Sequence, residues 1–145
     1  MARVMRGQPL VTGEAAGAAL VASEPLSFWG GYDYRSGEII DRRHPLSGVV
    51  SAGRILALPH ARGSSTTTAV LLEAVRAGTA PAAMLTSGPD TFFALAAIVA
   101  GEMYGRWFPV AQLSPEDFAR LRTGMHVAVA GDGTITLTDA EQEDR

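Results

Sequence analysis

A run of hydroxyl side chains stands between an arginine–glycine pair and an apolar, helix-periodic segment. The stretch reads PHARGSSTTTAVLLEA, residues 59–74, so Arg62 and Gly63 lead directly into five serines and threonines. The first backbone N–H groups of a helix have no partner within the helix and carry partial positive charge. An anionic substrate group can bind at such a helix start. Arg62 offers it a bidentate contact suited to a carboxylate or phosphate.

Two interpretations of the hydroxyl run remain open on the residues alone. A serine in this field can act as a proton acceptor, because N–H donors and a nearby cation favour its anionic form. Capping is the plainer interpretation, since Ser and Thr are preferred N-cap residues and contribute about 1 kcal/mol. A cap, however, needs one hydroxyl, and capping explains neither five in succession nor Arg62.

The second candidate motif is SFWGGYD, residues 27–33. Aromatic side chains beside a glycine pair can form a recognition surface, because glycine lets a backbone approach a ligand closely. Alternatively, Phe28 and Trp29 pack the loop onto the core, which is the usual fate of large apolar side chains. The sequence does not decide between these two outcomes.

Histidines mark the remaining candidates. His44 follows Asp41, Arg42 and Arg43, where it can be a general acid or an anion contact. A solvated loop or interface charge cluster is the favoured interpretation. His60 precedes the Ala61–Arg62 pair, and its orientation is open. His126 lies in an alternating segment and is predicted to be structural. Glu73 and Glu102 are predicted to be surface charges on helices.

Composition excludes several classes of function. The chain has 145 residues and a net charge of −3, and all twelve cationic side chains are arginine, so a nucleic-acid partner has little electrostatic support. The absence of cysteine excludes disulfides, cysteine-ligated zinc and an iron–sulfur cluster held by this chain. The three histidines lack metal-ligand spacing. No segment resembles a signal peptide or a membrane span. We therefore expect a cytoplasmic protein that binds no metal, nucleic acid or membrane.

The pattern of apolar residues and turn signals predicts an α/β domain over residues 1–140, followed by a polar tail at 141–145. Strands are expected at 3–7, 17–23, 49–58, 80–87 and 107–113, with a hairpin at 125–138. Helices are expected from the hydroxyl run to Gly78, over 91–105, and from Pro115 to about Arg122. Residues 24–48 are predicted to form a long ordered loop, and such loops are often functional.

Three ordered segments carry a resemblance to a known family: EPLSFWGGYDYRSGEIIDRRHPLSG (24–48), GRILALPHARGSSTTTAVLLEA (53–74) and APAAML (80–85). Together they resemble the small subunit of aconitase X-type dehydratases. That family includes archaeal phosphomevalonate dehydratase small subunits and bacterial cis-3-hydroxy-L-proline dehydratases. The resemblance runs from about Gly7 to Thr138, and the order and spacing of the segments make it specific.

The resemblance implies a swivelling β/β/α domain, like the mobile fourth domain of ordinary aconitase. It also implies a heterodimer with a large catalytic subunit that carries an iron–sulfur cluster or iron. The implied reaction is that of a hydro-lyase, which removes water from a small hydroxy acid. In the family the iron acts as a Lewis acid on the leaving hydroxyl, and a serine of the swivelling domain takes the proton.

Carried over by position, Ser64 matches the serine directly after the motif glycine and is the expected proton acceptor. Arg62, Gly63 and Ser65 match positions that flank the substrate. Ordinary aconitases read Gly-Ser-Ser-Arg at the comparable place, whereas here Thr66 follows the serines and the arginine precedes the glycine. This departure leaves the substrate open and the reaction class intact. Capping and catalysis then become compatible, with Ser65 or Thr66 as the cap.

The arginine-rich composition, typical of a GC-rich bacterial genome, favours cis-3-hydroxy-L-proline as the substrate. Mevalonate 5-phosphate, the substrate of a phosphomevalonate dehydratase, is the second possibility. Two other functions remain as alternatives: a non-catalytic interaction module on the same fold, and a free-standing anion-binding domain that uses Arg62 and the helix start.

Overall fold

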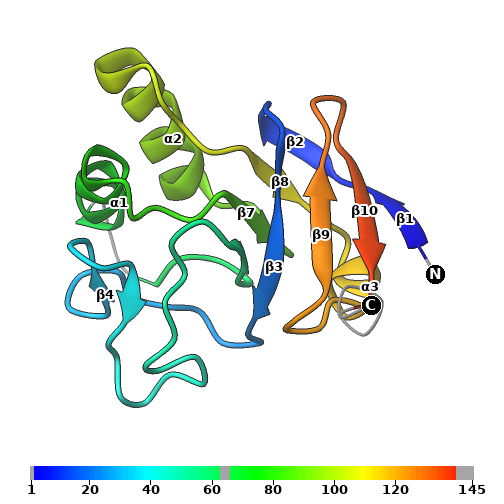
Figure 1. Cartoon of the computed structure of the whole chain (residues 1–145), viewed down its shortest axis with the longest axis horizontal. Helices are drawn as coiled ribbons and strands as arrows, with labels where there is room; N and C mark the ends of the chain where they lie inside the picture. Colours follow the sequence, from blue (N-terminus) through cyan, green and yellow to red (C-terminus); the bar gives the residue numbers. More distant parts are fainter. Residues whose placement is uncertain (1, 63–65, 140–145) are drawn as a thin grey trace.

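The computed structural model describes residues 2–62 and 66–139. Its elements follow one another along the chain as shown in Figure 1. The strands are β1 (Ala2–Arg6), β2 (Gln8–Val11), β3 (Ala15–Val21), β4 (Tyr32–Asp33), β5 (Glu38–Ile39), β6 (Ile55–Ala57), β7 (Ala83–Thr86), β8 (Val110–Gln112), β9 (His126–Val129) and β10 (Thr134–Thr138). The helices are α1 (Thr66–Ala77), α2 (Thr91–Tyr104) and α3 (Pro115–Phe118).

The main sheet has the strand order β1-β10-β9-β3-β6-β7-β8-β2. Strands β3, β6, β7 and β8 run parallel, and the pairings outside this group are antiparallel. Although β1 and β2 stand at opposite ends of this order, only Gly7 separates them in the chain. The sheet must therefore curl until its two edges meet at Gly7.

Gly7 lies where the curled sheet closes. Its N–H donates to Gly133 O at 2.8 Å. A Cβ at Gly7 would lie 3.1 to 3.3 Å from the side chains of Ile135, Leu113 and Ala111. A larger residue would therefore press on packed side chains from both halves of the sheet, whose interior is already close-packed.

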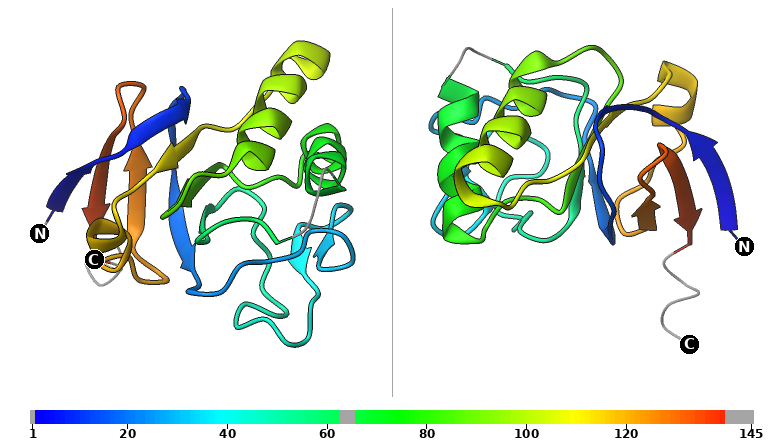
Figure 2. Two further views of the ribbon diagram at one scale, coloured as in Figure 1. Left: turned by 180° about the vertical axis from the view of Figure 1, so that it is seen from behind. Right: turned by 90° about the horizontal axis from the view of Figure 1, so that it is seen from above.

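Two separate cores fill the domain, one on each face of the parallel strands. Because side chains alternate along a strand, β6 sends Ile55 and Ala57 to one core and Leu56 to the other. The first core lies inside the curled sheet with apolar residues of β9 and β10. The second lies against α1, α2 and the 24–54 segment. Figure 2 shows the resulting layers, with both helices on one side of the parallel strands and β9, β10 and β1 on the other.

The long segment between β3 and β6 is ordered around a small hairpin, β4–β5. Buried Tyr32 holds it in place: its hydroxyl donates to Thr79 O at 2.8 Å and accepts from Ser51 Oγ at 2.9 Å. Thr79 lies just beyond the end of α1, so the Tyr32 phenol joins two distant parts of the segment, at Tyr32 and Ser51, to the backbone after that helix. Burial raises the pKa of Tyr32 to about 12, and the Ser51 hydrogen bond opposes that rise.

Most of the elements expected from the sequence are present. The helix ending at Gly78, the helix ending at Gly105 and the C-terminal hairpin are confirmed. The strand expected at 49–58 is reduced to β6, because residues 51–54 form a turn, with Arg54 N donating to Ser51 O at 3.0 Å. The strands expected at 80–87 and 107–113 are likewise the shorter β7 and β8.

Three further expectations were incomplete. Strand β2 (Gln8–Val11) was missed, and the 24–48 loop contains the β4–β5 hairpin. The helix expected to reach about Arg122 ends at Phe118. The predicted domain boundary at residue 140 and the polar tail at 141–145 lie outside the described residues. Within 2–62 and 66–139, no helix combines the length and apolar character needed to cross a membrane.

The closure of the sheet can be tested at the β9–β10 turn. Gly133 has a φ of +93°, and a Cβ there would lie 2.6 Å from Gly7 O. We expect Gly133→Ala to lower the free energy of unfolding by at least about 2 kcal/mol, measured by urea denaturation with far-UV circular dichroism. Gly131→Ala is the matched control in the same turn, because no atom lies within 4 Å of its Cβ position. Equal stabilities of the two variants would contradict the close approach.

The Tyr32 contact predicts alkaline sensitivity. The pKa of Tyr32 in the folded protein is about 12, above its ordinary value of 10.0, so folding favours the neutral phenol. This contribution is fully present below pH 10 and is lost as the pH rises to about 12, by up to roughly 2–3 kcal/mol. Tyr32→Phe should unfold more readily at pH 8 but lose less stability between pH 10 and 12 than the parent. Urea titrations at several pH values measure this, with Tyr34→Phe as the control at a partly exposed tyrosine.

Candidate functional site

The carboxyl ends of three neighbouring parallel strands meet at one edge of the sheet. Strands β3, β6 and β7 pair side by side in register. The chain leaves these ends through residues 22–31, 58–62 and 87–90. In open parallel sheets, ligands bind outside the carboxyl ends of the strands. We call these three segments together the carboxyl edge.

Backbone hydrogen bonds join the three segments of the carboxyl edge. Gly88 N donates to Pro59 O at 3.3 Å, and Arg62 N donates to Leu26 O at 3.1 Å. Leu26 and Ala61 also form an isolated parallel bridge. The segment that leads to the hydroxyl run is therefore held on both sides, by the 22–31 segment and by the 87–90 segment.

Asp90 fixes that segment through its side chain. One carboxylate oxygen accepts from Phe92 N at 2.9 Å and Phe93 N at 3.1 Å, which caps α2. The other oxygen accepts from Ala61 N. The carboxylate is 7% exposed, and both oxygens bind backbone N–H groups. A single buried charge thus ties the start of α2 to the backbone next to Arg62. The sequence signals the cap, an Asp before a helical segment, but gives no sign of the contact 29 residues away.

The residues predicted to do chemistry lie directly after this clamp. Gly63, Ser64 and Ser65 lie outside the described residues, and Arg62 and Thr66 bracket them. Arg62 is exposed and forms no ion pair with any residue that the structure describes. Thr66 begins α1. The exposed Arg62 therefore lies four residues before Thr66, the first residue of a twelve-residue helix. A guanidinium and the start of a helix both attract anions.

Two buried hydroxyls in these elements lack hydrogen-bond partners. Thr67 lies in the first turn of α1 and Thr86 ends β7, and both are fully buried. Neither Oγ1 atom finds a partner within the described ranges. Unsatisfied buried polar groups cost free energy and are rare in native structures. That two of them belong to elements beginning or ending at the carboxyl edge fits a polar site there.

The three histidines have different surroundings. His60 is exposed beside Arg62, with Nδ1 2.8 Å from Ala61 O. His44 is buried, contrary to the solvated cluster expected from the sequence. Its Nδ1 accepts from Leu46 N at 3.1 Å, which leaves the proton on Nε2 to donate to Glu24 O at 3.2 Å. Both ring nitrogens therefore hold the loop together, and His44 has none free for proton transfer. His126 is half-buried in β9.

In the SFWGGYD motif one aromatic side chain packs into the core and the next is exposed. Phe28 is fully buried and packs against Tyr32 and Phe93, with ring centroids 5.2 and 5.5 Å apart. Trp29, the next residue, is 71% exposed. One aromatic therefore anchors the loop to the core while its neighbour faces outward. Both helix glutamates are on the surface, as expected, and Glu73 pairs with Arg76 at 3.0 Å.

Metal ligands are not grouped in the part of the chain that the structure describes. No three histidine, aspartate or glutamate side chains there could jointly hold an ion. The sequence contains no cysteine. The described residues therefore do not fit an iron–sulfur cluster, and the carboxyl edge offers the exposed guanidinium of Arg62.

Comparison with known proteins identifies close relatives. Residues 4–137 match the family model of the aconitase X swivel domain. The chain is 51% identical over 122 residues to a cis-3-hydroxy-L-proline dehydratase of Pseudomonas aeruginosa, covering 79% of this chain and 21% of that protein. It is 32% identical over 136 residues to the phosphomevalonate dehydratase small subunit of Thermococcus gammatolerans, covering 93% of this chain and 98% of that one.

The fold has a close counterpart among solved structures. The crystal structure of aconitase X from Thermococcus kodakaraensis in its holo-form superimposes with a TM-score of 0.84 at 29% identity. The match covers 94% of this chain and 99% of that one. It confirms the α/β swivelling-domain fold expected from the sequence. The chain spans about a fifth of the Pseudomonas relative and nearly all of the Thermococcus gammatolerans one.

The Asp90 clamp yields a test of how the site is held. Asp90→Asn keeps one side-chain oxygen, which can still accept from the N–H groups that begin α2. The other oxygen is replaced by an NH₂ group, which cannot accept a hydrogen bond from Ala61 N. We expect the free energy of unfolding to fall by roughly 1–3 kcal/mol. Amide hydrogen exchange should show loss of protection at Ala61 with protection kept at Phe92 and Phe93.

Ser114→Ala is the matched control, because Ser114 caps α3 and touches no part of the carboxyl edge in its capping contact. It should cost about 1 kcal/mol and leave the Ala61 amide unchanged. An Ala61 amide equally protected in the Asp90 variant would show that the clamp does not hold the segment.

Proposed function

Because the chain belongs to the aconitase X swivel domain family, we propose that it is the swivelling subunit of a hydro-lyase. In this proposal it pairs with a large catalytic chain and helps remove water from a small hydroxy acid. The observation that carries the proposal is the position of Arg62, which is held on the carboxyl edge by its hydrogen bond to Leu26 O and lies four residues before the start of α1. Both features favour an anion, and a hydroxy acid brings a carboxylate.

Ser64 is the proposed proton acceptor. A free serine hydroxyl is a very weak acid, so it needs surroundings that favour its alkoxide. The N–H groups at the start of α1 and the guanidinium of Arg62 both stabilise negative charge. The alkoxide takes the proton from the carbon next to the one that carries the hydroxyl. The C–H electron pair forms the new double bond as the C–O bond breaks. The hydroxide that leaves takes up one proton from solvent to become water, and Ser64 returns the proton it gained to solvent, so that one molecule of water is lost in all.

Arg62, Gly63 and Ser65 are proposed to contact the substrate. The Arg62 guanidinium is a bidentate donor for the carboxylate, and Gly63 lets the backbone approach it without a side chain in the way. Asp90 does not touch the substrate in this scheme. It holds the backbone N–H of Ala61 and so positions the backbone of the next residue, Arg62.

The large chain is proposed to carry the iron–sulfur cluster or iron. This chain cannot hold such a cluster by thiolates, because it has no cysteine. The group would supply Lewis-acid chemistry at the leaving hydroxyl. The residues of the swivelling subunit are assigned only to binding the anion and moving the proton.

We propose cis-3-hydroxy-L-proline as the substrate. Support comes from the 51% identity to the Pseudomonas protein named for that activity. Mevalonate 5-phosphate is the second candidate, because the Thermococcus gammatolerans relative named for its dehydration aligns over 98% of its length. Arg62 and a helix start suit a phosphate as well as a carboxylate, so the assay must include both compounds.

Replacement of the proton acceptor is the direct test. In a complex of this chain with the large chain encoded in the same genome, Ser64→Ala should lower kcat by about 10²–10⁴-fold, the usual worth of a general base. KM should change little. The measurement is steady-state dehydration of cis-3-hydroxy-L-proline and, in parallel, of mevalonate 5-phosphate.

Ser47→Ala is the matched control, an exposed serine of the 24–48 loop outside the carboxyl edge. It should be as active as the parent. A fully active Ser64→Ala complex would refute the assignment of the base. A parent complex inactive on both compounds would favour a non-catalytic module or another hydroxy acid over the proposed substrates.

A further inference from the structure

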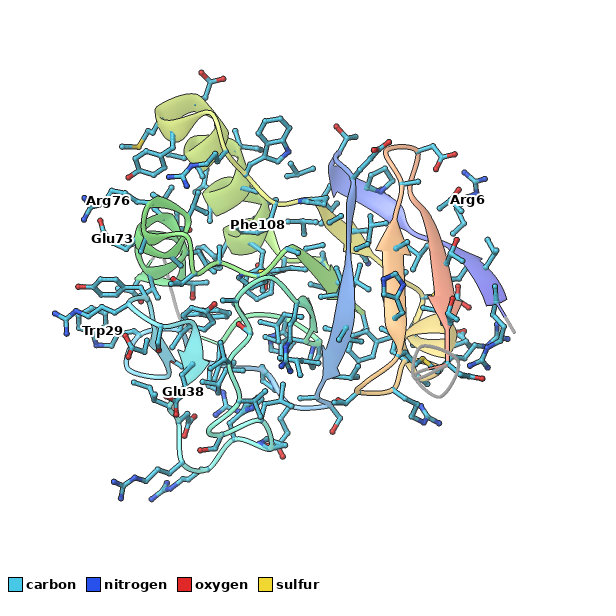
Figure 3. The ribbon with its side chains drawn as sticks, in the orientation of Figure 1. Arg6, Trp29, Glu38, Glu73, Arg76 and Phe108 are labelled. Atoms are coloured by element: carbon cyan, nitrogen blue, oxygen red, sulfur yellow. The ribbon has the colours of Figure 1, made fainter. Side chains whose placement is uncertain are left out.

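A polar hollow of about 300 Å³ opens where β7 and β8 end. Three segments of the chain supply its polar lining residues, which are Arg6, Gln8, Ser87, Gln112 and Ser114. Figure 3 shows Arg6 across the molecule from Glu73 and Arg76, which lie on α1. The polar hollow thus lies away from that helix, and the function proposed above uses none of its five polar residues.

The strand register brings two glutamines together at the polar hollow. Gln112, the last residue of β8, pairs with Thr86 of β7 on one side and with Gln8 of β2 on the other. Residues paired across strands place their side chains on the same face of a sheet as neighbours. Neither glutamine amide has a hydrogen-bond partner in the described part of the chain, and the buried Thr86 Oγ1 has none either. Three polar groups in one row thus keep unused hydrogen-bonding capacity.

Arg6 supplies the charge of the polar hollow. Its side chain is exposed at the end of β1, and it forms no ion pair with a residue that the structure describes. Hydrogen bonds from Thr134 and, less strongly, the positive charge of Arg6 lower the pKa of Asp132 in the β9–β10 turn. Asp132 is exposed, so water and salt screen this attraction. None of the described residues that line the hollow is acidic, which leaves Arg6 able to attract an anion there.

Two serine hydroxyls complete the set of donors. Ser114 Oγ accepts from Asp117 N at 3.1 Å, and this bond uses a lone pair and leaves the hydroxyl proton available. Ser87 is half-buried just after β7, and its hydroxyl has no partner among the described residues. One guanidinium, two amides and two hydroxyls can therefore all donate hydrogen bonds at the polar hollow.

We propose that the polar hollow binds a small oxyanion, which is the carboxylate or phosphate group of a ligand. Arg6 makes a bidentate contact with two of the oxygens, and the NH₂ groups of Gln8 and Gln112 donate to the same group. The position of the hollow agrees with the general rule that parallel sheets bind ligands beyond the carboxyl ends of their strands. This site is additional to Arg62 and does not depend on the proposed function.

Binding is measured by NMR titration of the isotope-labelled chain, with inorganic phosphate and acetate as separate probes. The ionic strength is held constant, so that the screening of surface charges does not change during the titration. With at least one probe, the backbone amide of Ser87 and the side-chain NH₂ groups of Gln8 and Gln112 should shift and saturate. The probe with the lower Kd identifies the ligand group as phosphate or carboxylate.

Arg6→Gln should raise the Kd of the bound probe at least about tenfold, because it removes a charged bidentate donor. Arg3→Gln is the matched control on the same strand, with a side chain that is 51% exposed, and should change Kd by less than about twofold. Asp132→Asn removes a competing carboxylate but keeps an oxygen that can accept from Thr134 N. It should lower Kd by about two- to threefold.

The same titration separates this site from the one at Arg62. Saturable shifts that persist in Arg62→Gln and disappear in Arg6→Gln would support the polar hollow, whatever the outcome of the dehydration assay. The opposite pattern would place the anion at Arg62, which overturns this inference and leaves the proposed function standing. The inference is also wrong if neither probe gives saturable shifts, or if Arg6→Gln and the parent chain have equal Kd values.

Discussion

Strands β3, β6 and β7 carry apolar side chains on both faces, and both faces must be kept from water. One face is buried because the sheet curls around it, and the other face is buried beneath α1 and α2. The inner face is lined with small side chains at Ala19, Ala57 and Ala83, alternating with larger neighbours such as Ile55. Small and large residues in alternation let a sheet curve tightly without voids. The curl in turn brings the two edge strands, β1 and β2, together at Gly7.

The same two-sided burial determines where polar chemistry can lie. Strand interiors offer no room for it, so polar groups gather where the parallel strands end. The connections there are held by main-chain contacts and by one buried carboxylate, Asp90. Because these contacts use backbone N–H and C=O groups, the segment before the hydroxyl run keeps its path largely independently of its own side chains. The side chain of Arg62 is therefore not needed to hold this segment in place and can serve to bind a ligand.

Sequence patterns predicted the helices well because each signal was local. The run of Val70, Leu71, Ala74 and Val75 marks the buried face of α1, and Gly78 and Gly105 end the two long helices with positive φ. Strand β2 escaped notice because Pro9 lacks an N–H, which argues against a strand in the middle of a sheet. As an edge strand next to β8, β2 tolerates that proline.

The features that the sequence did not predict depend on partners far along the chain. The second oxygen of Asp90 accepts from Ala61 N, and the buried His44 is held by a hydrogen bond from its Nε2 to Glu24 O. Phe28 and Trp29 are both aromatic neighbours in the sequence, yet one is fully buried and the other is 71% exposed. The identity of the candidate hydroxyl came from resemblance to a family, since local physics alone treats a serine before a helix as a cap.

The pairing of the first strand with the last has a consequence for how such a domain is connected to other chains. Ala2 lies opposite Thr138, and Arg3 and Asp139 approach to 3.7 Å, so both ends of the described chain emerge at one corner. Figure 1 places that corner across the sheet from α1. A tether attached at either end would therefore act as a hinge on the side of the sheet away from α1. The domain could thus present the same side to a neighbour whether it is part of a longer chain or a separate subunit. Both arrangements occur among its relatives, one matched over 21% of its length and another, named a small subunit, over 98%.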